Sequence, residues 1–308
     1  MARWPILALG ALCIAPTGHA APSTVAMMMN RRGMVRLAWR AVCDEQLTRP
    51  DDPDLQAQSG VILNDIGAFS DALVAFELSR GAGTFYDKMG GIGGHADALR
   101  GVGRPRDAAA LRREALATRG SKGRLALYQG LIGDYRAAGD AAAGREVALE
   151  GMSAYPGAAN LYAQLAELEL DAGDPDRVLE LLALSDRLQP AGVFRSHLVR
   201  ARMALADGDY SEARGHLATL RMRDLRSLEV LQVLMQLEMA SNGPAAALAV
   251  LEAPAWSHQD HPGVAALEAL ALFDAGEQPA ARERVRELER RYPLRGDVKA
   301  LRYVIDSF

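Results

Sequence analysis

The sequence predicts an all-α fold, a curved solenoid of about seven similar helix–turn–helix units. Three observations indicate this class: a regularly spaced glycine, helix-period apolar stretches on both sides of it, and a helix-favouring composition. The glycines are Gly67, Gly103, Gly139, Gly173, Gly208, Gly243 and Gly276, at intervals of 36, 36, 34, 35, 35 and 33 residues. Such units cannot bury their own apolar faces, so they must stack on their neighbours.

The composition favours helix and excludes one class of partner. Alanine, leucine and arginine are abundant, whereas aromatic residues make up only 6% of the 308 residues, which suits helices better than sheets. The formal net charge is −4, and both signs are mixed along the chain. Because binding to a phosphate backbone needs a strong basic excess, we expect no nucleic-acid partner.

Residues 1–20 have the pattern of a signal peptide. Arg3 precedes a short apolar run at 6–14, Pro16 ends that run, and Gly18 and Ala20 supply the small residues of a cleavage site. The run is shorter than the ~20 residues that cross a bilayer as a helix, and an uncleaved anchor is the alternative. No later stretch reaches that length, so we expect an exported, periplasmic protein with no transmembrane span after removal of the signal.

The segment 21–52 is predicted to be a lead followed by a capping helix over about 35–47. Loss of Cys13 with the signal peptide would leave Cys43 as the single thiol, which excludes an intramolecular disulfide. Cys43 lies in an apolar helical run, so a buried structural thiol is favoured over a reactive one. Asp52 and Pro53 then end the segment and begin the first helix of the array.

The repeat array is predicted to run over 53–293, each unit having a first helix, a tight turn at the glycine and a second helix. Glycine suits this turn because a helix C-terminus often ends in a left-handed residue. An aspartate follows the glycine in three units, where it can accept hydrogen bonds from free amides, and a proline stands early in three second helices. These residues are Asp140, Asp174 and Asp209, and Pro105, Pro175 and Pro244.

The residues around these glycines resemble the tetratricopeptide repeat (TPR) pattern. The best unit has Tyr162, Leu165, Ala166, Gly173, Leu182 and Pro190; partial units have Gly60, Gly67, Phe69, Ala72 and Phe76; Gly139, Ala148 and Pro156; Gly208, Tyr210, Ala213 and Leu217; and Gly276, Ala281, Val285 and Pro293. Small residues let the paired helices approach closely, and large apolar ones fill the gap to the next unit. The resemblance implies a right-handed superhelix whose first helices line the concave face.

Two residues and three segments depart from the pattern or end it. Arg112 and Glu252 stand where a large apolar residue is expected. The stretch 81–101 is rich in glycine, which predicts a frayed unit or a hinge. The loop 253–262 is longer than the usual turn. Residues 294–308, with a helix from about Asp297, are predicted to cap the open end of the stack, because an uncapped solenoid exposes apolar surface.

No motif predicts catalysis, a metal or a cofactor. Gly91, Gly93 and Ala96 match the spacing of a dinucleotide-binding turn, but that turn needs a preceding strand and a parallel sheet. His258, Asp260 and His261 could in principle hold a divalent metal, yet a solvated loop is the better interpretation of so short a pattern. Nucleophile elbows, zinc-protease motifs and phosphate loops do not occur. We therefore expect a protein that is not an enzyme.

The inner wall of the array is the predicted binding surface. Counting back from each glycine places these residues on it: Gln129, Arg136, Asn160, Glu167, Arg195, Leu198, Arg202, Val233, Leu237, Leu270 and Phe273. Arg195 and Arg202 would form a cationic pair for acidic or carbonyl groups. The four apolar residues after Arg202 have a competing interpretation as packing between repeats. The Lys and Asn pairs that bind chaperone tails in some TPR domains are absent.

The expected function is a non-catalytic scaffold or assembly factor that holds a peptide or protein partner in its concave groove, in the bacterial cell envelope. The resemblance to TPR modules of envelope machines, including those of exopolysaccharide export, rests on class and compartment. The alternatives are an enzyme or ligand-binding solenoid, which would show a deep pocket with converging titratable groups, and a structural component that self-associates through an exposed end.

Overall fold

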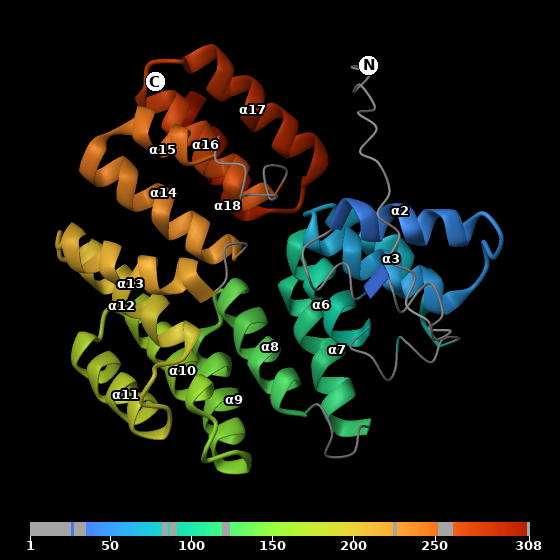
Figure 1. The fold of residues 1–308 in the computed structure, drawn as a ribbon, viewed down its shortest axis with the longest axis horizontal. Helices are drawn as coiled ribbons and strands as arrows, with labels where there is room; N and C mark the ends of the chain where they lie inside the picture. Colours follow the sequence, from blue (N-terminus) through green and yellow to red (C-terminus); the bar gives the residue numbers. More distant parts are fainter. Residues whose placement is uncertain are drawn as a thin grey trace.

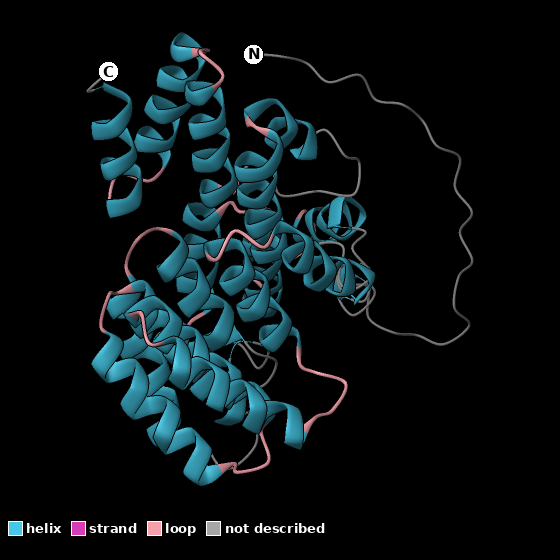
Figure 2. Cartoon of the chain, turned by 90° about the vertical axis from the view of Figure 1, so that its left-hand side faces the viewer, coloured by secondary structure: helices cyan, strands magenta, loops and turns pink. Residues whose placement is uncertain are grey.

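The computed structural model describes residues 26–27, 35–81, 86, 91–118, 124–223, 227–251 and 261–306. Within these ranges the chain is helical and contains no strand (Figure 2). The signal-peptide segment, the pair His258 and Asp260, and Glu252 lie outside them. No helix of the described part combines the length and the apolar content that a membrane span requires.

Seven pairs of helices follow one another among the described residues, as the glycine spacing predicts (Figure 1). They are α3 (Pro53–Asp65) with α4 (Phe69–Ser79), α6 (Gly91–Gly101) with α7 (Pro105–Thr118), α8 (Arg124–Ala137) with α9 (Ala141–Ala154), α10 (Ala159–Ala172) with α11 (Pro175–Leu188), α12 (Phe194–Ala206) with α13 (Tyr210–Arg223), α14 (Leu228–Asn242) with α15 (Pro244–Leu251), and α16 (Pro262–Asp274) with α17 (Gln278–Arg291). The predicted fold class is confirmed.

The turns have the geometry that their residues predict. All seven repeat glycines have positive φ, between 71° and 88°. Asp140, Asp174 and Asp209 each accept a hydrogen bond from the amide three residues on, at 2.9–3.0 Å. Pro105, Pro175 and Pro244 are the first residues of α7, α11 and α15. A left-handed glycine follows each first helix, and an aspartate or proline begins the second helix in five of the seven described pairs, whereas α4 and α17 begin without a side-chain cap.

The glycine-rich stretch does not fray over its second half. Residues Gly91–Gly101 form α6, a regular helix. A Cβ on Gly94 would lie 2.6 Å from the ring of Phe76, and one on Gly101 would lie 2.2 Å from the ring of Phe69. These glycines let α6 approach α4 closely, so the expectation of a hinge is wrong for Gly91–Gly101.

Two further helices lie at the ends of the array. Helix α2 (Val35–Gln46) packs Ala38 and Val42 against Ile62 of α3. Its Cys43 is half-buried, and burial together with the charge of Asp44 raises the pKa of the thiol, which keeps it in its less reactive form.

Helix α18 (Gly296–Asp306) covers α16 and α17 with Val298, Leu301 and Ile305. Its other side exposes Tyr303 and Val304. The helix begins at Gly296, one residue before the predicted start at Asp297.

The core runs between the two layers of helices. The first helices α8, α10, α12, α14 and α16 lie side by side in chain order, and each second helix packs on the outside of its partner. One apolar cluster extends from α7 to α12, a second from α12 to α16, and a third from α16 to α18. Each repeat therefore buries its apolar face against the next.

The last repeat also touches the first two, across more than 190 residues of sequence. The Tyr292 hydroxyl donates to the carbonyl oxygen of Gly67 at 2.7 Å, and Arg295 Nη1 donates to the carbonyl oxygen of Gly101 at 3.3 Å. The Phe69 ring packs edge-on against His261, with centroids 5.2 Å apart. We call this contact the seam; its residues are Gly67, Phe69, Gly101, Val102 and Gly103 on one side and His261, Tyr292, Leu294 and Arg295 on the other. It closes the array into a ring.

Candidate functional site

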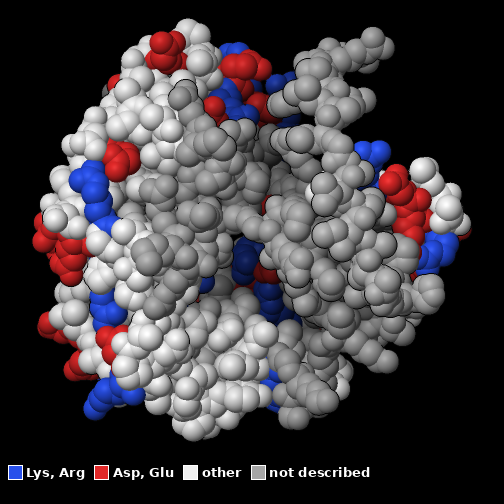
Figure 3. Space-filling model, viewed as in Figure 1, with Lys and Arg blue, Asp and Glu red and all other residues white. Residues whose placement is uncertain are grey.

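A cavity of about 1260 Å³ lies inside the ring. Its wall comes mainly from the first helices of successive repeats, α6, α8, α10, α12 and α14, and is completed by residues of the seam. In the space-filling view, arginine and carboxylate side chains are visible deep in the hollow between the two halves of the molecule (Figure 3). Part of the inner wall predicted from the repeat pattern is therefore the wall of a half-open cavity with both polar and apolar lining residues.

Five of the predicted wall residues do line this cavity. They are Gln129, Arg136, Asn160, Glu167 and Arg195. Their positions follow from the repeat spacing, which places equivalent residues of successive first helices on one face. Whether these residues bind a partner stays a prediction.

The other predicted residues lie elsewhere. Leu198 is 2% exposed and belongs to the core between α12 and α16, so its expected place on the wall is wrong. Val233 and Leu237 are buried in the same cluster, as the packing alternative predicts. Leu270 and Phe273 are half-buried against the apolar cluster of α16–α18.

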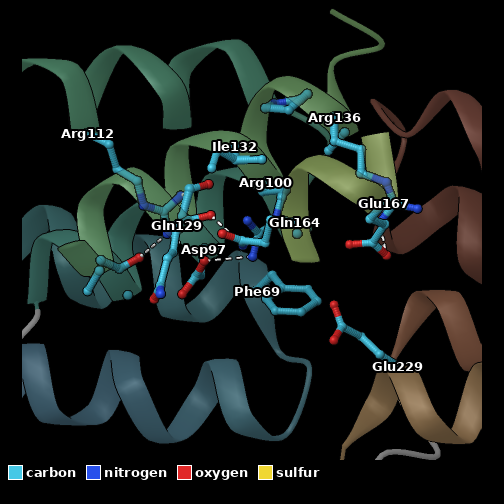
Figure 4. A pocket seen from close by; sticks show the side chains of 18 of the residues that line it. Phe69, Asp97, Arg100, Arg112, Gln129, Ile132, Arg136, Gln164, Glu167 and Glu229 are labelled. Atoms are coloured by element: carbon cyan, nitrogen blue, oxygen red, sulfur yellow. Dashed lines mark hydrogen bonds and ion pairs between the residues drawn. The ribbon is translucent and has the colours of Figure 1, made fainter. Parts of the chain in front are cut away.

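Four charged residues form a compact group at one side of the cavity, which we call the α6–α8 cluster. It consists of Asp97, Arg100 and Arg112, which line the cavity (Figure 4), and Asp134, which is fully buried behind them. Arg112 pairs with both carboxylates and donates to the carbonyl oxygen of Gly93 at 3.0 Å. Burial disfavours its charged form, but the two carboxylates outweigh burial and raise the pKa of Arg112. This residue breaks the apolar repeat pattern, and its guanidinium is held by ion pairs instead.

A second group, which we call the α8–α14 ladder, runs across four first helices. Its members are Arg136 on α8, Glu167 and Asp171 on α10, Arg195 and Arg202 on α12, and Glu229 on α14. Glu167 is its centre, because its carboxylate lies 2.9 Å from Arg136 and 3.2 Å from both Arg195 and Arg202.

The ladder also fixes the charge of its outer members. Burial tends to raise the pKa of Asp171, but hydrogen bonds and charges from Arg136 and Arg202 outweigh it and lower that pKa. Arg195 has a raised pKa, since Glu167 and Glu229 outweigh its burial. Arg195 and Arg202, expected as a cationic pair on the wall, both pair with Glu167, but only Arg195 is among the described lining residues of the cavity.

The cavity is consequently rich in charge but balanced. Among the described lining residues, five are arginines and five are aspartates or glutamates. An acidic ligand would have to displace a carboxylate from an arginine in order to bind it. The wall therefore does not favour one sign of charge.

Three amide side chains of the wall have no such partner. Gln129, Asn160 and Gln232 line the cavity, are half-buried, and form no side-chain hydrogen bond within the part of the chain that the structure describes. Gln164 differs, because its Nε2 donates to the carbonyl oxygen of Gln129 at 3.0 Å. In Figure 4, Gln164 lies between the two charged groups, and Gln129 lies beside Asp97 and Arg100. These amides can donate to and accept from a ligand at once.

The residues singled out for other chemistry have structural places. Gly91, Gly93 and Ala96 belong to α6, the first helix of a two-helix repeat, which is not the context of a nucleotide-binding turn. His261 caps α16, where its Nδ1 accepts from the amide of Gly263 at 3.0 Å. Within the described ranges, no group of three or more His, Cys, Asp or Glu side chains could hold a metal ion.

The ion pairs of the wall are absent from the expectations above, although the sequence carries a signal for several of them. Arg100 and Asp134, Arg136 and Asp171, Glu167 and Arg202, and Arg195 and Glu229 are 34, 35, 35 and 34 residues apart. Opposite charges at the repeat spacing occupy equivalent positions on adjacent first helices. A search for charge pairs at this spacing would have predicted them.

Comparison with known proteins agrees on the fold. No family model and no curated protein match this chain. Among solved structures, PilW, described as a widely conserved type IV pilus biogenesis factor, is similar with a TM-score of 0.52 and 17% identity, over 69% of this chain and 96% of that one. A tetratricopeptide repeat protein from Parabacteroides merdae is similar with a TM-score of 0.51 and 13% identity, over 82% and 98%. The chain has the TPR fold, as the residue pattern predicts.

Proposed function

We propose that this protein is a non-catalytic scaffold that holds an extended segment of a partner protein in the cavity of its ring. The observation that carries the proposal is the cavity itself, a half-open space of about 1260 Å³ whose wall is contributed by consecutive repeats and carries charged, amide and apolar groups. That volume exceeds the roughly 300–1,000 Å³ of a typical small-ligand pocket. A segment of chain would fill it, whereas a folded domain would not enter it.

The wall is built to be rigid before any partner binds. Ion pairs of the α6–α8 cluster and the α8–α14 ladder join neighbouring first helices at 2.8–3.2 Å. A wall that is already ordered loses little side-chain entropy on binding, which favours affinity. Rigidity of this kind supports recognition by a preformed surface.

The free amides indicate what kind of segment fits. Gln129, Asn160 and Gln232 each offer a donor and an acceptor, the combination that pairs with peptide N–H and C=O groups. The charged groups around them are already paired, so they offer no net attraction to an acidic segment. We infer that the bound segment is extended and uncharged where it meets these amides.

We place this activity in the bacterial cell envelope, as a periplasmic scaffold or assembly factor. Two observations support the placement: the signal-peptide pattern of residues 1–20, and the fold shared with PilW, whose description names pilus biogenesis. The partner belongs to an envelope complex in this proposal.

Binding of a small ligand, or catalysis on one, is the second candidate function. A pocket with converging titratable groups is the feature expected for it. The cavity has both features. The carboxylates of the two charged groups, however, are each paired with an arginine, so none of them is free to face a substrate as a general acid or base. The geometry supports binding better than catalysis.

Photo-crosslinking in the cell tests the proposal. A benzophenone amino acid replaces Gln129 in the cavity, and the matched control replaces Leu149, which is 55% exposed on the outer helix α9. We expect a protein adduct from position 129 that is absent from position 149. Equal labelling from both positions, or an adduct of small-molecule mass at position 129, would contradict the scaffold proposal.

A further inference from the structure

The seam differs from every other turn of the array that the structure describes. A Cβ on Gly67 would lie 3.0 Å from the Cα of His261, and one on Gly103 would lie 2.9 Å from the carbonyl carbon of Leu294. The other five turn glycines, from Gly139 to Gly276, have no atom within 4 Å of the same position. Two turns of the first repeats are thus covered by the last repeat, while the remaining turns are open.

The seam is a narrower contact than the joints between consecutive repeats. Consecutive first helices lie side by side and share an apolar core, whereas no described helix of the last repeat packs lengthwise along α4 or α6. Across the seam, Phe69 and Val102 join the apolar cluster of α16–α18, and two side-chain hydrogen bonds reach backbone carbonyls. If the ring opens anywhere, these contacts predict that it opens here.

The seam is also part of the cavity wall. Phe69, Gly101, Gly103, His261 and Arg295 belong to both. Parting of the two sides would therefore remove one wall of the cavity while the ion-paired walls stay intact.

We propose that the seam is a gate, which opens to admit a partner segment to the cavity and closes behind it. A segment within a longer protein, with folded parts on both sides, cannot be threaded into a closed ring. It can enter sideways through a break in the ring. The purpose of the gate rests on the proposed function, but its opening does not depend on which partner binds.

The groups that hold the gate are specific. Tyr292→Phe removes the hydroxyl that binds the Gly67 carbonyl, and Arg295→Gln removes the guanidinium that binds the Gly101 carbonyl. Loss of one such hydrogen bond corresponds to a population change of about five- to tenfold. The matched control is Tyr162→Phe, because the Tyr162 hydroxyl also donates to a carbonyl, that of Pro156, away from the seam.

Distances between spin labels test whether the gate moves. With the native cysteines replaced by serine, labels at Asp71 on α4 and Lys299 on α18 span the seam, and labels at Glu146 and Asp176 form a control pair; all four positions are exposed. In the otherwise unmodified protein we expect the seam pair to give a narrow distance distribution with a minor long-distance component. That component should grow about five- to tenfold in Tyr292→Phe, and further when Arg295→Gln is added. An unchanged distribution in both variants, or the same change in Tyr162→Phe, would overturn the gate.

Thiol access tests whether this motion admits a chain. A cysteine at position 129 reacts with iodoacetamide or with a small folded protein carrying a maleimide, and each rate is divided by that of a cysteine at the exposed position 146. We expect the two seam variants to accelerate the bulky reagent several-fold and iodoacetamide little. An unchanged ratio would reject the gate even if crosslinking from position 129 supports the scaffold, so the two proposals fail separately.

Discussion

Arg112 occupies a position where the repeat pattern expects a large apolar side chain. It is 3% exposed, and Asp134, its partner, is fully buried. A buried ion pair gains little over an apolar pair of the same volume, but loss of one partner leaves an uncompensated charge. The stability of the α6–α8 cluster therefore depends on its completeness.

This dependence predicts an asymmetric pair of variants. Arg112→Met should lower the free energy of unfolding by about 3–5 kcal/mol, because Asp134 then keeps only Arg100 as its partner. The double variant Arg112→Met with Asp134→Leu should recover most of this loss, since Arg100 still pairs with Asp97 at 2.7 Å. Urea denaturation followed by circular dichroism measures both.

An exposed pair is the control for these variants. Arg177 and Glu180 lie 2.6 Å apart on the surface of α11, and Arg177→Met should cost less than about 1 kcal/mol. A similar loss from Arg177→Met and Arg112→Met, or no recovery in the double variant, would show that burial is not the cause.

His95 predicts how stability depends on pH. Its ring is 3% exposed, stacks on Phe76 and shares a 2.6 Å hydrogen bond with the Tyr86 hydroxyl. Burial, and then the charges of Arg80 and Arg104, lower the pKa of His95 from 6.5 to about 4. Below about pH 6.5 the unfolded chain binds a proton at His95, whereas the folded chain does not until the pH approaches 4. The contribution of neutral His95 to the free energy of unfolding is therefore complete above pH 6.5 and is lost as the pH falls toward 4.

The comparison of wild type with His95→Gln isolates this effect. The difference in free energy of unfolding between the two proteins should be largest at pH 7.5 and should shrink steadily between pH 6.5 and pH 4.5. Urea titrations at several pH values give the curve. A difference that is constant over this range would mean that His95 titrates normally in the fold.

At the scale of the elements, the glycine turns set the geometry of each helix pair, and the turns at Gly67 and Gly103 also contact the last repeat. Gly173 has φ +79° and open space around it, so its only requirement is the left-handed conformation. Gly103 has φ +88°, and a Cβ on it would also lie 2.9 Å from the carbonyl carbon of Leu294. The same residue type thus meets one demand in one repeat and two demands in another.

Alanine substitution separates the two demands. Gly173→Ala should cost about 1–2 kcal/mol, the price of a left-handed conformation for an L-residue. Gly103→Ala should cost measurably more, because its Cβ also pushes Leu294 away and strains the seam. Urea denaturation of the two variants gives the difference, and equal losses would mean that the seam contact contributes nothing to stability.

The elements were also the level that the sequence predicted best. Turn glycines, capping aspartates and early prolines are local signals, and they placed all seven helix pairs of the described part. The wall was predicted less well. Leu198 lies about 60° around the helix from Arg195, which is enough to turn it toward α14 and the core. The ion pairs were missed because each repeat was considered alone.

At the scale of the whole molecule, the seam changes how the repeats depend on one another. In an open solenoid each unit contacts only its neighbours, so a local defect weakens with distance along the chain. Here the first and last repeats are neighbours in space, through Tyr292 and Gly67. The sequence could not predict this contact, since it depends on the accumulated rotation of every repeat between them.

Hydrogen exchange measures the resulting coupling. Phe76→Ala deletes a fully buried ring of the first repeat and should destabilise it by about 3–5 kcal/mol. We expect faster exchange in α16–α18 than in α10–α13, although the latter are closer in sequence. Exchange that declines steadily from the first repeat to the last would indicate that the seam transmits nothing.

The seam has one more consequence, for how such a chain can vary. An open stack tolerates the gain or loss of a unit, because its ends have nowhere to meet. Here the gain of one pair of helices would carry Tyr292 past the carbonyl of Gly67, and the loss of one pair would leave Tyr292 short of it. Closure of the ring therefore fixes the number of repeats at seven.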